Sequence, residues 1–391
     1  MSRSVRLLLF AAVVATAIPI VAFAVALALA PQPTDFMCFW SGAALVARGQ
    51  DPYDPATWAA AVDGLFPNWL GLLRRPPCPG SYAYPLWTGI LTVPLGVLPL
   101  GVAATIWMLL LVGGLGAGIV LLARAAKLEP RRTLLLAAIT LASQPAWLTA
   151  LTSQYGGVEL FAIGLLALPA TAARAGRLSV GTALLLLKPH IAPLVVVERL
   201  RAAPRRAAMV AAAVILAVGV ASLVARPSWP LEWLAELAGH RTTIAGTSAT
   251  IYGFTAWLSG APGLGILITA LAVLAFTVAL RRISLPDPID RIAVAVTAGL
   301  LAVPYLSSGD PVVLAVAWCA ILRRAGPRQV ATLVALVVAA DVVPWVLYAL
   351  REPVAPPGDI RNALELPVTA ALLVVALRRP PLARPSGSGP A

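Results

Sequence analysis

Two charged residues stand where charge is expensive. Lys188 opens the tripeptide Lys188-Pro189-His190 inside an apolar stretch that runs over residues 178–197. An ionisable group at membrane depth is costly and usually functional. Asp35 stands where the first hydrophobic segment ends, at the head of the sequence Asp-Phe-Met-Cys-Phe-Trp. A carboxylate beside a membrane and a cation within it point to chemistry on a charged lipid.

The two residue types suit the transfer of a sugar from a polyprenyl-phosphate donor to a hydroxyl. A carboxylate at hydrogen-bond distance can take the proton from the acceptor hydroxyl, and Asp35 is our candidate for this general base. Positive charge must also hold the phosphate that leaves with the lipid. The candidates for that task are Lys188 and His190, with Arg241 as a helper.

Each of these residues also has a structural interpretation. Asp35 is a residue type that commonly caps helices, and a helix is expected to begin at Phe36. Lys188 could extend its ammonium to the membrane surface, or pair with Glu159 or Glu198. Residue type alone leaves both alternatives open.

His190 and Asp310 have structural interpretations of their own. His190 is one of only two histidines, and most histidines are hydrogen-bonded packing residues. Asp310 precedes Pro311 and could do no more than terminate a helix.

The composition excludes a soluble protein. Of the 391 residues, 60% are hydrophobic and only 12% are charged, which indicates a polytopic membrane protein with all-α architecture. The net charge of +13 comes from short arginine clusters between apolar runs, so it indicates topology and not a nucleic-acid partner. Three cysteines and two histidines form no metal-binding pattern, and no cofactor is expected.

Apolar runs predict about ten transmembrane helices. The first run, 7–30, is too long for the core of a signal peptide and is expected to stay as a helix. The runs lie at 7–30, 100–122, 133–150, 157–173, 207–225, 263–280, 291–306, 311–322, 329–350 and 363–377.

Two further apolar stretches, 86–100 and 178–197, are interrupted by prolines. If the second stretch enters the membrane and returns, most of the 29 lysines and arginines share one face. If it crosses, they divide almost evenly. The positive-inside rule therefore favours broken, re-entrant helices with Lys188 near the apex, facing a polar cavity.

This topology places both termini on the cytoplasmic side and two long loops, 31–85 and 226–262, outside. Cys38 and Cys78 fall in the first of these loops and could form a disulfide. Residues 1–378 form one membrane domain, and the tail 379–391, rich in Pro, Gly and Ser, is expected to be disordered in the cytoplasm.

Several short motifs together resemble glycosyltransferase family 87, integral-membrane enzymes of the GT-C superfamily. The first is Asp35-Phe36 with Trp40, followed by the segment 43–54 that ends in Asp-Pro-Tyr-Asp. The later landmarks keep the order of the family: Tyr84-Pro85-Leu86, Gln154, Leu187-Lys188-Pro189-His190, Pro304-Tyr305 and Asp310.

The resemblance implies a GT-C-like mannosyltransferase, or a related pentosyltransferase, that uses a polyprenyl-phosphate sugar. It implies an acceptor hydroxyl on a lipid or glycan at the outer face of a bacterial plasma membrane. Asp35 then matches the catalytic aspartate of the first loop, and a functional role of Lys188 is favoured over a side chain that only reaches to the membrane surface. The expected cavity and substrate residues are Trp40, Tyr84, Gln154, Tyr305 and Asp310.

Two alternatives come from other classes of protein. A transporter for lipids or small solutes would use Lys188, Glu159 and Asp341 as its pathway. A non-catalytic membrane scaffold would keep the fold without turnover. An enzyme needs Asp35 and Lys188 at one outward cavity, whereas a transporter needs a path to both faces.

Overall fold

The computed structural model describes most of the chain after residue 34. The described residues are 35–63, 65, 78, 81–143, 145–146, 149, 154–169, 175–189, 191, 193–244, 250–282, 285–303, 306, 309–350 and 365–381. The side chains of 237–244, 257, 262, 280 and 341–350 are not described. The expected first span, 7–30, and most of the tail lie outside these residues.

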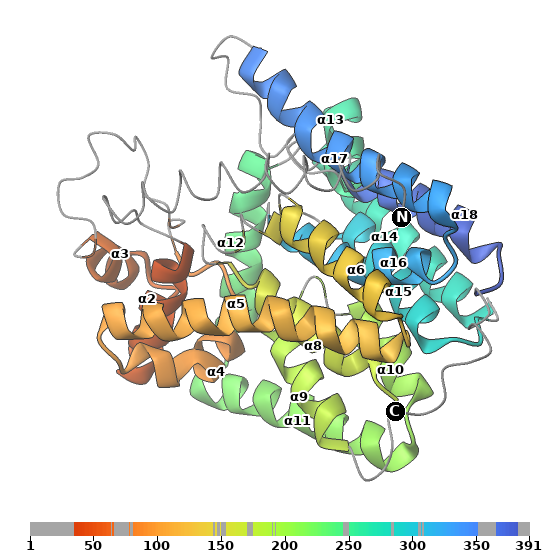
Figure 1. The fold of residues 1–391 in the computed structure, drawn as a ribbon. Coiled ribbons are helices and arrows are strands. Elements are labelled where there is room, and N and C mark those ends of the chain that lie inside the picture. The colour runs from red at the N-terminus through yellow and green to blue at the C-terminus, as the bar shows by residue number, and fades with distance from the viewer. Residues whose placement is uncertain are drawn as a thin grey trace.

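The described residues form helices and no strand (Figure 1), which confirms the predicted all-α class. The first half contains α2 (Asp35–Ala47), α3 (Pro55–Asp63), α4 (Leu86–Gly96), α5 (Leu100–Ala125), α6 (Pro130–Ala142), α8 (Gly156–Ala167), α9 (Ala175–Leu186) and α10 (Pro193–Ala202). The second half contains α11 (Arg205–Ala225), α12 (Trp229–Ile244), α13 (Ile251–Ser259), α14 (Pro262–Arg282), α15 (Pro288–Ala302), the 3-10 helix η3 (Asp310–Leu314), α16 (Ala315–Leu322), α17 (Pro327–Leu350) and α18 (Glu365–Leu377).

Helix α16 lies at the centre of the largest core. Each of its residues is buried, and its sequence is apolar on all sides, as expected for a helix with no face toward solvent. Its neighbours in the structure are α5, α6, α8, α15 and α18. This core fixes the position of η3, which runs directly into α16.

Both proline-interrupted stretches contain a break, although Pro94 lies inside α4 and does not interrupt it. Helix α4 ends at Gly96, and α5 starts at Leu100 after an extended Pro99. Helices α9 and α10 flank a gap that holds Lys188, and Pro193 is the first residue of α10. Proline lacks an N–H donor and is tolerated in the first turn, so each helix restarts there.

The α9 and α10 pair enters and leaves at one end of the molecule. The side chain of Arg199, late in α10, donates a hydrogen bond to the carbonyl of Leu168 at 3.1 Å. Leu168 directly follows α8 and precedes α9. The end of α10 therefore lies beside the segment that precedes α9, so the two helices begin and end on the same side, as a re-entrant pair requires.

Some helices are shorter than the apolar runs indicated. Among the described residues, only α5 and α11 are both long and apolar enough to cross a membrane by themselves. Helix α8 ends at Ala167 because Leu168 takes extended backbone ahead of Pro169. Helix α6 ends at Ala142, where Ser143 is already extended.

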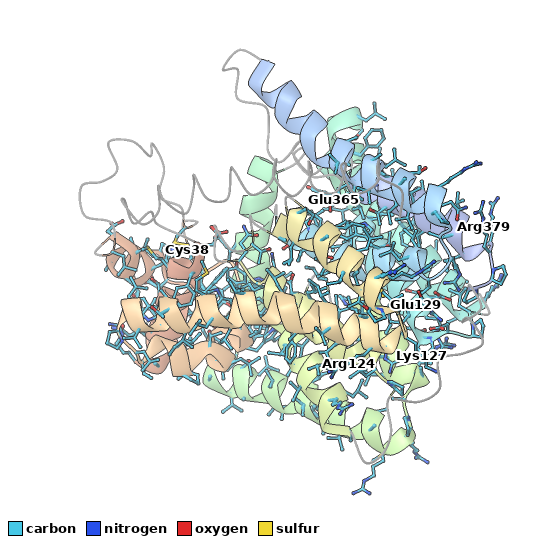
Figure 2. All side chains as sticks on the ribbon, viewed as in Figure 1. Cys38, Arg124, Lys127, Glu129, Glu365 and Arg379 are labelled. Atoms are coloured by element: carbon cyan, nitrogen blue, oxygen red, sulfur yellow. A yellow bond between two sulfur atoms is a disulfide. The ribbon has the colours of Figure 1, made fainter. Side chains whose placement is uncertain are left out.

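Arginines gather at one end of the helices. Figure 2 shows Arg124, Lys127 and Arg379 at the far end from Cys38. Ion pairs hold this end together: the buried Arg324 binds Asp290 through two hydrogen bonds of 2.8 and 2.5 Å, and the partly buried Arg323 binds Asp287. Arginines gathered at one end of the helices are what the positive-inside rule expects of cytoplasmic loops.

The opposite end is closed by a disulfide between Cys38 and Cys78. The sequence left open whether these two cysteines pair, and the structure joins them. Nearby, Arg226 pairs with Asp51 and Glu232, each at 2.6 Å. The hydrogen bond from Arg226 holds the pKa of the Glu232 carboxyl below its usual range.

Helices α5 and α8 approach each other through glycines. A Cβ atom on Gly114 would stand 2.5 Å from the carbonyl oxygen of Gly157, and one on Gly157 would stand 2.1 Å from that of Leu111. No real side chain fits at such distances. Glycine therefore sets the separation of the two helices and the position of the first turn of α8.

Replacing Gly114 with alanine is expected to lower the free energy of unfolding by about 1–3 kcal/mol, because the added methyl group must push α5 and α8 apart. The neighbouring Gly113 faces open space and is the matched control. Gly113→Ala should leave stability unchanged or raise it by up to about 1 kcal/mol. Thermal unfolding in detergent measures both, and equal effects would show that the contact does not limit packing.

Candidate active site

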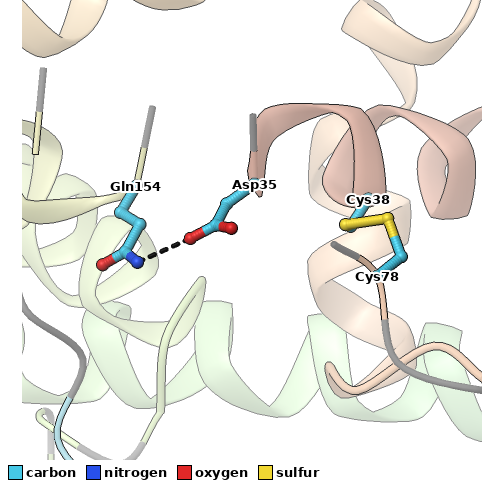
Figure 3. Close-up of a disulfide and its surroundings, with 4 residues drawn as sticks. All are labelled: Asp35, Cys38, Cys78 and Gln154. Atoms are coloured by element: carbon cyan, nitrogen blue, oxygen red, sulfur yellow. Dashed lines mark hydrogen bonds between the residues drawn. A yellow bond between two sulfur atoms is a disulfide. The ribbon is translucent and has the colours of Figure 1, made fainter. Parts of the chain in front are cut away.

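Asp35 is the first residue of α2 and points to the start of α8 (Figure 3). Its Oδ2 accepts a hydrogen bond of 2.5 Å from Nε2 of Gln154. The two residues are 119 positions apart in the chain. The first-loop aspartate is thus held by an amide from the helical core, so its orientation depends on both parts of the molecule.

Two kinds of contact hold α2 in place. The disulfide joins Cys38, almost one helical turn after Asp35, to Cys78 (Figure 3). The buried ring of Phe36 stacks on Trp107 at 5.6 Å between centroids, and Phe39 packs on Tyr155 at 4.4 Å. Covalent and aromatic contacts therefore anchor the turn that presents Asp35.

Replacing Cys38 and Cys78 together with serine is expected to lower the free energy of unfolding by about 2–4 kcal/mol. The bond spans 40 residues, so its loss frees a long loop in the unfolded chain. Thermal unfolding with and without a reducing agent measures the effect. Reductant should destabilise wild type and leave the double variant unchanged; an equal response from both would contradict the assignment.

Gln154 also lies against the residue before Asp310. A Cβ on Gly309 would stand 3.2 Å from Oε1 of Gln154 and 2.6 Å from Oγ1 of Thr149. The Thr149 hydroxyl donates a hydrogen bond to the carbonyl of Gly309 at 3.2 Å. Gly309 permits this approach because it has no side chain. Gln154 is therefore next to Asp35 on one side and next to the start of η3 on the other.

Lys188 and Asp310 form an ion pair in the interior. The side chain of Lys188 is 3% exposed, and that of Asp310 is fully buried. Burial removes the hydration of both groups, so each depends on the other and on its remaining contacts. Neither Glu159 nor Glu198, the partners weighed from the sequence, makes this contact; Glu198 instead binds Arg201 and Arg291.

Helix α4 fixes the backbone that leads to Lys188. The indole N–H of Trp87 donates to the carbonyl of Leu186 at 2.8 Å, and the hydroxyl of Thr88 donates to that of Leu187 at 3.0 Å. These bonds replace the helical hydrogen bonds that α9 loses at its end. Lys188 therefore lies in a loop whose preceding backbone carbonyls are fixed by hydrogen bonds from side chains of α4.

Aromatic residues surround this region. Tyr84 packs edge-on against Phe39, with the ring centroids 4.7 Å apart, and its carbonyl accepts a hydrogen bond from Tyr53. The indole N–H of Trp40 donates to the carbonyl of Leu98 at 3.1 Å. Tyr84 and Trp40 are therefore part of the packing that joins α2 to α4 and α5.

Asp310 begins a helix and does not terminate one. It is the first residue of η3, and its carboxylate points to Lys188. Thr149 was missed in the sequence because nothing marks a lone threonine in an apolar run. His190 and Tyr305 lie outside the described residues, as do the side chains of Arg241 in α12 and Asp341 in α17.

Replacing Gln154 with leucine is expected to lower kcat by roughly tenfold to a hundredfold, because Asp35 loses the amide that orients it. The KM for the substrate should change little. Steady-state kinetics on purified protein check this, with the exposed Gln50→Leu as the control. A Gln154→Leu variant as active as wild type would show that Asp35 is oriented by other contacts.

Comparison with known proteins identifies the family. The sequence model of glycosyltransferase family 87 matches residues 82–304. The match contains Tyr84, Gln154 and Lys188, and it ends before Asp310 and starts after Asp35. Searches of curated proteins and of solved structures found no match. Because the matched region is more than half of the chain, this protein belongs to glycosyltransferase family 87 and is a membrane glycosyltransferase.

Proposed function

We propose that this protein transfers a sugar, with mannose as the expected sugar, from a polyprenyl-phosphate donor to a hydroxyl of a lipid or glycan acceptor. The observation that carries the proposal is one chain of contacts through the site. Asp35 binds Gln154, Gln154 lies against Gly309, and the next residue, Asp310, binds Lys188. A base and a cation are thus brought to one region from four separate segments.

Asp35 removes the proton of the acceptor hydroxyl as that oxygen attacks the anomeric carbon. The new bond joins the acceptor oxygen to this carbon, and the bond from the carbon to the phosphate oxygen breaks. Its electron pair stays on the phosphate, and the proton stays on Asp35. A single in-line displacement of this kind inverts the anomeric configuration.

Lys188 stabilises the negative charge that grows on the departing phosphate. An ammonium has three N–H donors, so contact with Asp310 and contact with a phosphate oxygen are compatible. The buried carboxylate of Asp310 holds the ammonium in place before the donor arrives. Preorganisation of this kind spares the enzyme the reorientation of a charged group during the reaction.

Two observations support an active site that faces the outside of a bacterial plasma membrane. Disulfides persist in oxidising compartments, and the Cys38–Cys78 bond lies almost one helical turn from Asp35. Arginines gather at the other end of the helices, as in cytoplasmic loops (Figure 2). The donor would then reach the site through the bilayer with its sugar on the outer side.

The direct test uses purified protein in liposomes with polyprenyl-phosphate-[14C]mannose and a membrane lipid extract as the acceptor source. A matched reaction contains GDP-[14C]mannose in place of the lipid donor. We expect label in a new lipid or glycan product with the lipid donor alone. Transfer from the nucleotide sugar would contradict the donor class, and passage of the intact donor across the bilayer without product would favour the transporter alternative.

A further inference from the structure

Glu159 is a buried acid for which the reaction above has no use. It lies in the first turn of α8 and is 1% exposed. Neither of its carboxyl oxygens has a hydrogen-bond partner among the described residues. Buried polar groups are nearly always hydrogen-bonded, so an acid of this kind needs an explanation.

The acid lies within electrostatic range of the Lys188–Asp310 pair. Lys188 attracts its negative charge and Asp310 repels it. Tyr155, one helical turn earlier, interacts with it as well, and the Tyr155 hydroxyl is also buried without a described partner. Glu159 thus belongs to the same polar cluster as the ion pair, although it touches neither member in a hydrogen bond.

The other described helices that pack on α8 place no charged side chain in the turns that lie beside Glu159. The charged residues of α5, α9 and α15 lie in the turns at the arginine-rich end, and α16 carries only a thiol. These groups are Arg124 of α5, Arg177 of α9, Asp290 and Arg291 of α15, and Cys319 of α16.

Among the described residues, the cluster then holds two carboxyl groups and one ammonium. An ionised carboxylate that is buried without hydrogen bonds is strongly disfavoured, because it has lost its hydration and gained no partner. Asp310 is in direct contact with Lys188 and keeps its charge through that pair. A proton on Glu159 removes the second negative charge and leaves the cluster neutral.

We propose that Glu159 is a positioning residue that carries a proton in the active enzyme and acts through Lys188. The inference rests on the proposed role of Lys188 as the ligand of the donor phosphate. When Glu159 is neutral, the Lys188 ammonium can bind Asp310 and the donor phosphate without competition from a second carboxylate. An ionised Glu159 competes for the ammonium and repels the incoming phosphate, so donor binding weakens.

Infrared spectroscopy tests the proton without any turnover. The carbonyl band of a protonated carboxylic acid is separate from the bands of ionised carboxylates. We expect wild-type protein at neutral pH to show such a band that is missing from Glu159→Gln. Exposed Glu129 provides the control, and Glu129→Gln should keep the band. Identical spectra for wild type and Glu159→Gln would overturn the proposal.

Donor kinetics across pH test the link to Lys188. For wild type, kcat/KM for the lipid donor should fall about tenfold per pH unit above the ionisation of Glu159. Glu159→Gln mimics the neutral acid, so it should keep near wild-type activity at the optimum and lose this alkaline fall. An unchanged pH profile, or a large loss at every pH in a variant that unfolds at the wild-type temperature, would overturn the proposal.

The two measurements separate failure of this inference from failure of the proposed function. If wild-type protein transfers no sugar from the lipid donor, the proposed function is wrong, and the infrared band still decides whether Glu159 holds a proton. If wild type transfers sugar while the infrared band or the pH response of Glu159→Gln is not as expected, only the inference about Glu159 is wrong.

Discussion

Replacing Asp35 with asparagine is expected to lower kcat for sugar transfer by about 10²–10⁴-fold, the usual contribution of a general base. Asparagine keeps the size of the side chain and can keep a hydrogen bond to Gln154, so the site should stay assembled. The KM for the donor should stay within a few-fold of wild type, because the proposed ligand of the donor phosphate is Lys188 and not Asp35. Single-turnover kinetics with labelled donor measure the chemical step directly.

The matched control for this variant is Asp63→Asn. Asp63 is an exposed acid at the end of α3, in the same segment, 31–85, that contains Asp35. Its replacement removes the same charge from the surface and should leave kcat unchanged. Equal losses in both variants would attribute the effect to the net charge of the segment. Full activity in Asp35→Asn would show that another group accepts the proton.

Replacing Lys188 with methionine is expected to have two separable effects. The free energy of unfolding should fall by about 3–5 kcal/mol, because Asp310 is left as a buried charge without its counterion. Transfer should also fall below detection, because this variant lacks the cation that we propose binds the donor phosphate. Thermal unfolding and the labelled-donor assay measure the two effects, with exposed Lys127→Met as the control.

A double variant separates stability from function. Adding Asp310→Asn to Lys188→Met removes the uncompensated charge and should recover roughly half or more of the lost stability. Activity should stay absent, because no cation has been restored. If activity returned together with stability, Lys188 would be a structural residue and its role as a phosphate ligand would be wrong.

The sequence predicted the positions of helix breaks better than it predicted the lengths of the helices. Pro99 and Pro193 mark helix starts that the structure shows, because proline acts locally on the backbone, whereas Pro94 lies inside α4. The apolar run at 157–173 indicated a longer helix than α8, which ends at Ala167. Apolar composition alone does not show where a chain leaves the helical conformation.

The residues of the candidate site were easier to find than their contacts. Asp35 and Lys188 attract attention because charge is rare in an apolar chain. The partner of Lys188 is 122 residues away, so no local pattern could select Asp310 over Glu159 or Glu198. Gly309 and Thr149 carry no chemical signal in the sequence, and their contribution depends on how closely α8 and η3 approach.

In the proposed function, Asp35 and Lys188 act on one donor molecule. The most direct measurement is a cryo-EM structure of Asp35→Asn in nanodiscs with polyprenyl-phosphate-mannose bound. We expect the donor phosphate at the Lys188 ammonium and the anomeric carbon on the side of residue 35, with the lipid tail extending into the bilayer. A donor phosphate bound away from Lys188, or a sugar that cannot reach residue 35, would contradict the account.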